Sequence, residues 1–352
     1  MADPDQQEDK AKDSIRATDA LPPVEPPDPG LILKLFFVPG LIVFIVVMVV
    51  LGVTALVSLG SDPLERLAAI ERGAANAWQE AESIANELRS NEELRSNKEF
   101  NTRMEAFLRQ KIQDPLTTGN EEELNTEIKL RVFLCKCLGE FDIPGGFPVL
   151  MEAAMPPQSG TEAAGLDVRQ AAIESIALLI HNVQNAKGQL PETQLFDFLN
   201  DRSREGGATD KDLGPIRSRA AFALGVLGGE QAEARLEEML TLEFYPDARF
   251  NAATGLARWG NAACLETLTE MIDPDTTAPL EVEQIEEARD IKRWTIQFNG
   301  IKAAELLAEK NADVDLSSLT PVVHKLQEVE DLPAAVAQQA KQLLNVLRER
   351  TP

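Results

Sequence analysis

The chain has 352 residues, of which 44% are hydrophobic and 5% aromatic, and its formal net charge at pH 7 is −24. A charge of this sign and size argues against nucleic-acid binding, because contacts to phosphate depend on clustered Lys and Arg. An apolar set dominated by Ala and Leu favours helices that pack through small side chains over a β core.

The first segment, residues 1–30, has the composition of a disordered tail. It contains eight acidic side chains, three basic ones and six prolines, without apolar periodicity. Such a segment has too little apolar surface to offset the entropy cost of ordering. We therefore expect residues 1–30 to form a disordered, acidic, proline-rich tail.

A single transmembrane helix is predicted over residues 31–59. Residues 35–59 form a run of 25 residues without a charged side chain. At about 1.5 Å per residue, a helix of this length reaches roughly 37 Å and exceeds the ~30 Å hydrocarbon core of a bilayer. A cleaved signal peptide is the alternative, but the run is too long and lacks a basic leading region. Two basic residues lie near each end of the run, so the positive-inside rule leaves the orientation open.

Residues 61–125 are expected to form a helical cap next to the membrane. Ser61 or Asp62 can cap a helix with Pro63 in its first turn, and an amphipathic pattern continues to Leu88. A second helix is expected over residues 98–113. Terminal repeats of helical arrays usually depart from the consensus, which favours a degenerate first repeat. A coiled-coil stalk is the alternative, but a sustained heptad of large residues is missing.

The strongest pattern in the chain is a helical hairpin that recurs at an offset of 32 residues. One copy covers residues 216–240 and the next covers 248–272. Small and apolar residues recur at intervals of three and four, so they share one helix face, and a Gly then lets the chain reverse into a second helix. The offset matches Arg217 with Arg249, Ala220 with Ala252, Ala221 with Ala253, Leu224 with Leu256, Gly228 with Gly260 and Leu236 with Leu268.

Two earlier copies share this frame, with Arg131 and Arg169 at the recurring Arg position. In these features residues 126–273 resemble the HEAT-repeat family, in particular membrane-anchored proteins of bacterial type, with phycobilisome-lyase-type repeats as the nearest variant. The resemblance implies an α-solenoid, because one hairpin cannot cover its own apolar face and must stack on neighbours. It also implies that the second helices line the concave surface. The fold expected is all-α: a solenoid of HEAT-like helical hairpins preceded by one transmembrane helix.

Residues 274–352 are expected to hold degenerate repeats and a distal cap. A turn-rich break over residues 273–279 contains two prolines. Helices are predicted around 281–309, 319–330 and 332–348. The last of these carries apolar residues on one face and would close the array.

No group of residues points to catalysis, a cofactor or a metal. Cys135 and Cys137 lie two residues apart on a predicted helix and so face different directions. In the repeat frame they and Cys264 occupy positions that hold Ala or Gly in other copies, which indicates packing. His181 and His324 lie on different predicted repeats. We therefore predict a non-enzymatic protein without a cofactor, and no small-molecule substrate is evident.

The recurring Arg131, Arg169, Arg217 and Arg249 admit two interpretations. They form either a basic row for an acidic partner or, as the resemblance implies, a ladder that pairs with acids of the adjacent unit, for which Asp167 and Asp247 are candidates. We favour the ladder.

The predicted binding residues are Glu238 and Glu270, which occupy equivalent positions in the second helices of the two best repeats. They lie outside the apolar stripe, so their replacement is expected to change stability little. The predicted function is a single-pass, membrane-anchored, non-catalytic scaffold that binds protein partners on the solenoid surface. An enzyme-associated HEAT-like lyase module and a structural spacer are the alternatives.

Overall fold

The computed structural model describes residues 40–41, 43–49, 62–116, 120–156, 162–281 and 283–350, with the backbone alone at 162–164. The chain divides into two units, Met1–Asp62 and Pro63–Pro352. In the first unit, residues 40–41 and 43–49 are helical, and the large apolar side chains among them are 45–62% exposed.

The predicted tail at 1–30 lies outside the described residues, and so does most of the predicted membrane span at 31–59. Within the ranges that the structure does describe, no helix combines the length and the apolar character needed to cross a bilayer. The membrane span therefore stays a prediction from sequence.

The second unit is built from helices, joined by short turns, and it shows no strand in the residues described. Its α-helices are α3 (Pro63–Glu71), α4 (Ala77–Ser90), α5 (Glu92–Arg95), α6 (Lys98–Gln113), α7 (Glu121–Gly139), α8 (Phe147–Ala153), α9 (Glu162–Asn185), α10 (Glu192–Arg202), α11 (Gly214–Leu227), α12 (Glu230–Leu242), α13 (Pro246–Arg258), α14 (Leu265–Ile272), α15 (Glu286–Lys310), α16 (Leu319–Gln327) and α17 (Ala334–Arg350).

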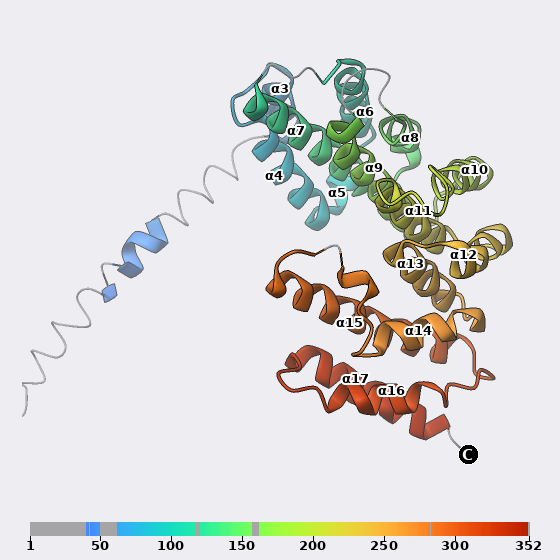
Figure 1. Ribbon diagram of the computed structural model, residues 1–352. Coiled ribbons are helices and arrows are strands. Elements are labelled where there is room, and N and C mark those ends of the chain that lie inside the picture. Colours follow the sequence, from blue (N-terminus) through green and yellow to red (C-terminus); the bar gives the residue numbers. More distant parts are fainter. Residues whose placement is uncertain are drawn as a thin grey trace, which may run out of the picture. The chain divides into compact units, whose positions relative to one another are not determined.

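The helices stack as a two-layered solenoid (Figure 1). The first helices of the hairpins form a continuous row, in which each packs on the next: α4, α7, α9, α11, α13, α15 and α17. Each second helix packs on the first helix of the following repeat, as α10 does on α11, α12 on α13 and α14 on α15. The all-α, HEAT-like hairpin architecture that the repeats predict is thus present.

Small residues let the first helices approach closely. Ala220, Ala221, Ala252 and Ala253 are fully buried. A Cβ placed on Gly225 of α11 would lie 2.6 Å from a backbone atom of Gly255 in α13. Larger side chains at these positions would force the two helices apart.

The turns of the two best repeats form where the sequence predicts them. Gly228 follows α11 and Gly260 follows α13, with φ angles of 72° and 78°. Side chains with a Cβ rarely adopt this left-handed region, which explains the Gly in each copy. Between α3 and α4 the predicted continuous amphipathic pattern is broken at Gly73, whose φ is 82°.

The curvature of the solenoid differs from the prediction. The first helices α9, α11 and α13 lie on the inner side of the curve, and the second helices α10 and α12 lie on its outer side (Figure 1). A large hollow opens on the inner side, lined by residues of α11, α13 and α15. The expectation that second helices line the concave surface is therefore wrong.

Candidate protein-binding groove

Glu238 lies on the outer helix α12 and is already engaged in ion pairs. Its carboxylate accepts hydrogen bonds from Arg204 Nη2 at 2.7 Å and from Arg235 Nη1 at 2.8 Å. The hydrogen bonds from Arg204 and then Arg235 lower the pKa of Glu238 to about 2. Arg235 is buried and also donates to the hydroxyl and carbonyl of Ser203, so this cluster ties α12 to the end of α10.

Glu270, on α14, accepts a hydrogen bond from Arg249 of α13. Both predicted binding residues thus stand on second helices and hold the solenoid together. Neither carboxylate lines the inner hollow. The two acids are equivalent in the sequence, but their contacts differ, since Glu238 ties α12 to the end of α10 and Glu270 pairs with α13.

The recurring arginines form a ladder with different partners from those predicted. Three of them connect a first helix to the second helix, or the end of it, in the same hairpin. Arg169 pairs with Glu205, Arg217 with Glu243, and Arg249 with Glu270. Arg131 bonds Glu127 on its own helix and the carbonyl of Asp114.

Neither acid proposed as a ladder partner has that role. The carboxylate partners of Arg169, Arg217 and Arg249 come from the same hairpin, because each guanidinium reaches across the two layers rather than along the row. Asp247 instead pairs with Lys292 of the next first helix, at 3.3 Å. Asp167 lines a hollow on the inner side.

The three cysteines are fully buried, and each is a free thiol. Burial raises the pKa of Cys135 and of Cys264 to about 12, and it raises that of Cys137 as well. The Cys137 thiol donates to the carbonyl of Ala81, and that of Cys264 to the carbonyl of Asn261. These contacts fit the packing interpretation.

His181 and His324 are exposed, and they belong to α9 and α16. His181 shares a hydrogen bond with Asn185, one turn further along its own helix. Within the part of the chain that the structure describes, no three His, Cys, Asp or Glu side chains gather as a metal site would require.

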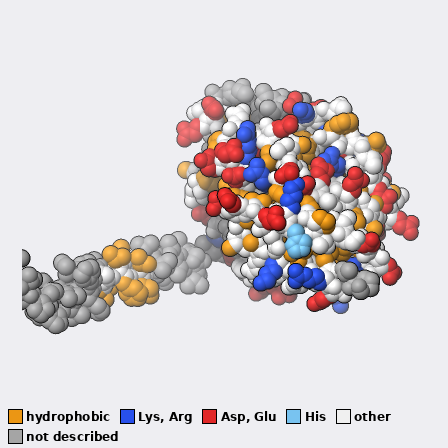
Figure 2. Space-filling view, turned by 60° about the horizontal axis from the view of Figure 1, so that its bottom comes forward, with side chains coloured by type: hydrophobic (Ala, Val, Ile, Leu, Met, Phe, Trp, Pro, Cys, Tyr) orange, Lys and Arg blue, Asp and Glu red, His pale blue; other side chains and the backbone are white. Residues whose placement is uncertain are grey.

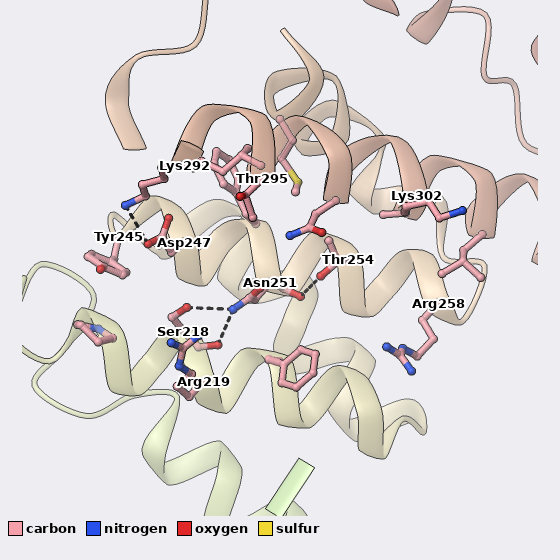
Figure 3. A pocket seen from close by; sticks show the side chains of 18 of the residues that line it. Ser218, Arg219, Tyr245, Asp247, Asn251, Thr254, Arg258, Lys292, Thr295 and Lys302 are labelled. Carbon is pink, nitrogen blue, oxygen red and sulfur yellow. Dashed lines mark hydrogen bonds and ion pairs between the residues drawn. The ribbon is translucent and has the colours of Figure 1, made fainter. Parts of the chain in front are cut away.

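A hollow of about 640 Å³ lies on the inner side of the solenoid (Figure 3). Helix α13 lies between α11 and α15, and all three contribute residues to the lining. The Asn251 amide donates to the carbonyl of Ser218 at 3.0 Å and to its hydroxyl at 2.9 Å. This arrangement leaves the Asn251 side-chain oxygen available as an acceptor.

The two ends of this hollow carry basic side chains (Figure 3). At one end Lys292 points toward Asp247, and at the other Arg258 and Lys302 lie at the rim. The wall also includes Phe222 and Leu306, which are 39% and 36% exposed. The hollow therefore combines apolar surface with positive charge.

A second hollow of about 320 Å³ continues from the first toward α7. Gln170 and Arg219 line both, so the two are contiguous. We call the two together the concave groove, formed by the inward-facing residues of α7, α9, α11, α13 and α15 that line these hollows. It crosses five successive first helices.

The charge of the concave groove is opposite to that of the whole chain. Its lining holds six basic side chains, Lys129, Lys136, Arg219, Arg258, Lys292 and Lys302, against three acidic ones, Asp167, Glu174 and Asp247. The chain as a whole has a net charge of −24. On the face shown in Figure 2, by contrast, acidic and basic side chains are interspersed.

Sequence reasoning missed this groove because its basic residues do not repeat. Arg219 and Arg258 occupy positions that hold Asn251 and Val226 in the other copy, and Lys292 and Lys302 lie where the repeat frame decays. The available signal was the set of polar positions on the first helices, several of which hold Lys or Arg.

No protein-family model matches the chain, and no curated protein matches it. Among solved structures, the chain is similar to human deoxyhypusine hydroxylase in complex with glycerol, with 15% sequence identity and a TM-score of 0.31. The similarity covers 80% of this chain and 84% of that chain.

Proposed function

We propose that the protein is a membrane-anchored, non-catalytic scaffold that binds a segment of a partner protein in the concave groove. The observation that carries this proposal is the groove itself, which crosses five stacked helices and combines apolar walls, side-chain amides and positive charge. Solenoids present such extended concave surfaces because each repeat adds one strip to the same face.

The membrane anchor is the part of the proposal that rests on sequence. The uncharged run at residues 35–59 is long enough to span a bilayer. The large apolar side chains described within it, at position 41 and positions 43–49, are 45–62% exposed. Exposed apolar surface of this kind is typical of contact with lipid or protein.

The outer surface around Glu238 and Glu270 is the competing docking site, and the two acids remain predicted binding residues. Their carboxylates already form ion pairs with arginines, so a partner would have to displace these bonds. In the concave groove, some cations form no ion pair among the described residues, so a partner that binds them has no such bond to displace. We therefore place partner binding in the groove.

Site-specific photo-crosslinking in the native host separates these possibilities. A photoreactive residue is placed at Asn299 in the groove, at Glu237 on the outer helix α12, or at Lys341 on α17 as a control. The proposal expects a discrete crosslinked protein from Asn299 and none from Lys341. Crosslinking from Glu237 alone would favour the outer surface, and absence of crosslinks at both would favour a structural spacer.

A further inference from the structure

We infer that the concave groove binds a short, extended, acidic segment of a partner protein, with carboxylates at both ends and an apolar side chain between them. This inference rests on the proposed function and specifies the chemistry of the ligand. The unpaired charges of the groove, their positions and the groove wall between them point to this ligand.

Three cations of the groove have no carboxylate partner in the part of the chain that the structure describes. Arg219 pairs with Glu174 at 2.6 Å, Lys292 with Asp247 at 3.3 Å, and Lys302 with Glu305 at 3.1 Å. Among the described residues no ion pair joins Lys129, Lys136 or Arg258 to an acid, although acidic side chains far outnumber basic ones in the chain. An anionic ligand would give these three cations the negatively charged partner that they lack.

The two lysines are held in place without an acid. The Lys129 ammonium lies 4.9 Å from the centre of the Trp78 ring, and that of Lys136 lies 4.9 Å from the centre of the Phe133 ring. The rings stack on each other, with centroids 6.1 Å apart. A cation over an aromatic face is attracted to the ring but keeps its full charge, so it can still bind a carboxylate.

The opposite end of the groove is marked by Arg258, with Lys302 beside it at the rim (Figure 3). Between these two ends, Phe222 of α11 offers apolar surface and Gln170 of α9 offers a side-chain amide. An amide donates and accepts hydrogen bonds, as a peptide backbone does. The wall is therefore suited to an extended chain with one apolar side chain inserted.

The spacing of the helices sets the length of this segment. From α7, which carries Lys136, to α13, which carries Arg258, the row advances by three helices. At about 8–10 Å per helix this is roughly 24–30 Å. An extended chain rises about 3.3 Å per residue, so about seven to nine residues reach from one cationic end to the other.

A short acidic segment fits the charge distribution better than a nucleic acid does. A nucleic acid extends beyond the groove and would meet the surface of a chain with a net charge of −24. A segment with a few carboxylates stays within about 8–10 Å of the basic side chains, the distance over which charges act in physiological salt.

The test uses a library of random 12-residue peptides displayed on phage and selected on the immobilised full chain. The inference expects enriched peptides with Asp or Glu on both sides of an apolar residue. Their affinity should fall as NaCl is raised, and it should fall at least tenfold for the variant Lys136→Glu/Arg258→Glu. A fluorescent 20-nucleotide single-stranded RNA, measured in parallel, should bind more weakly than these peptides.

The matched control is Lys98→Glu/Lys341→Glu, which changes the net charge equally at two exposed positions outside the groove. It should retain peptide affinity within about twofold. Should the first variant unfold, Lys136→Gln/Arg258→Gln removes the same charges without reversing them. Enrichment of neutral or basic peptides, no enrichment, tighter RNA binding, or equal affinity for groove and control variants would overturn the inference. Photo-crosslinking from Asn299 to a partner would still uphold the proposed function in that case.

Discussion

At the scale of single residues, the arginine that recurs in each hairpin is a structural tie. Arg217 and Glu243 have side chains that are only 1% and 2% exposed. The guanidinium bonds both carboxylate oxygens, at 2.8 and 3.0 Å, and also the carbonyls of Glu205, Ala208 and Asp210. One side chain thereby closes the loop that joins α10 to α11 and fixes the end of α12.

Replacing Arg217 by Ala is expected to destabilise the fold by about 3–5 kcal/mol, because Glu243 would remain buried without its partner. Urea denaturation followed by circular dichroism measures the change. Arg219→Ala is the control, since that arginine pairs with Glu174 where both side chains are about 40% exposed. Exposed pairs contribute at most about 1 kcal/mol. Equal losses for the two variants would show that burial of the first pair is unimportant.

Because Glu238 and Glu270 form ion pairs with arginines, we expect them to contribute to stability, unlike the expectation from sequence. Reversal of both to Lys would place a cation beside Arg204 and Arg235 in one repeat and beside Arg249 in the other. We expect a loss of about 1–3 kcal/mol. The control Glu328→Lys/Glu349→Lys alters the same net charge at exposed positions and should retain the wild-type melting temperature.

The acid dependence follows from the lowered pKa of Glu238. The folded pKa, about 2, lies below the ordinary value of 4.5, so the charged form is favoured in the folded state. The corresponding stabilisation is present above about pH 4.5 and is lost as the pH falls toward 2. Glu238→Gln should flatten the stability profile in that window, and an unchanged slope would contradict the assignment.

At the scale of helices, the contact between α11 and α13 depends on two glycines that meet at their backbones. Gly225→Ala would introduce a methyl group 2.6 Å from Gly255. Alanine favours a helix over glycine by about 1 kcal/mol, so the steric cost must exceed this gain to lower stability. We expect a net loss of about 1–3 kcal/mol in thermal or urea denaturation. An increase in stability would mean that the two helices can move apart to admit the methyl group at no cost in free energy.

The hairpins could be predicted from sequence because their signals are local. The offset of 32 residues, the paired alanines and the turn glycines such as Gly228 and Gly260 each follow from neighbours within one unit. The curvature of the row could not be predicted, because it sums small rotations between helices that no single repeat encodes. The assignment of second helices to the concave side failed for this reason.

The groove was less predictable than the hairpins. Lys129 and Lys136 stand on rings from two different helices, and Arg258 lies three first helices further along the row. Because these residues lie far apart in the sequence, no local pattern indicates that they share a surface. Repetition instead drew attention to Glu238 and Glu270, although Glu238 ties α12 to the end of α10 whereas Glu270 pairs with Arg249 across the two layers.

At the scale of the whole molecule, charge is distributed unevenly between the groove and the rest. Six basic and three acidic side chains line the groove of a chain with a net charge of −24. On the inference above, we expect the surrounding acidic surface to disfavour large polyanions and the groove to attract small anionic segments. Selectivity for short ligands over nucleic acids would then follow from this imbalance.

The division of the chain into two units leads to a prediction about truncation. Removal of residues 1–60 leaves the unit that begins with α3 at Pro63, whose apolar core is formed by its own helices. We expect the shortened protein to give a strongly helical circular dichroism spectrum and one cooperative thermal transition. We also expect it in the soluble fraction, since residues 35–59 form the uncharged run.

The full chain, expressed in parallel, is the control and should sediment with membranes and resist extraction by alkaline carbonate. A spectrum dominated by β structure, or a broad non-cooperative transition, would contradict the independent solenoid. Recovery of the full chain in the soluble fraction would instead contradict the anchor and leave the solenoid intact. The solenoid and the membrane anchor can be contradicted independently. The experiment therefore tests the fold, which the helices show, separately from the membrane attachment, which is predicted from composition.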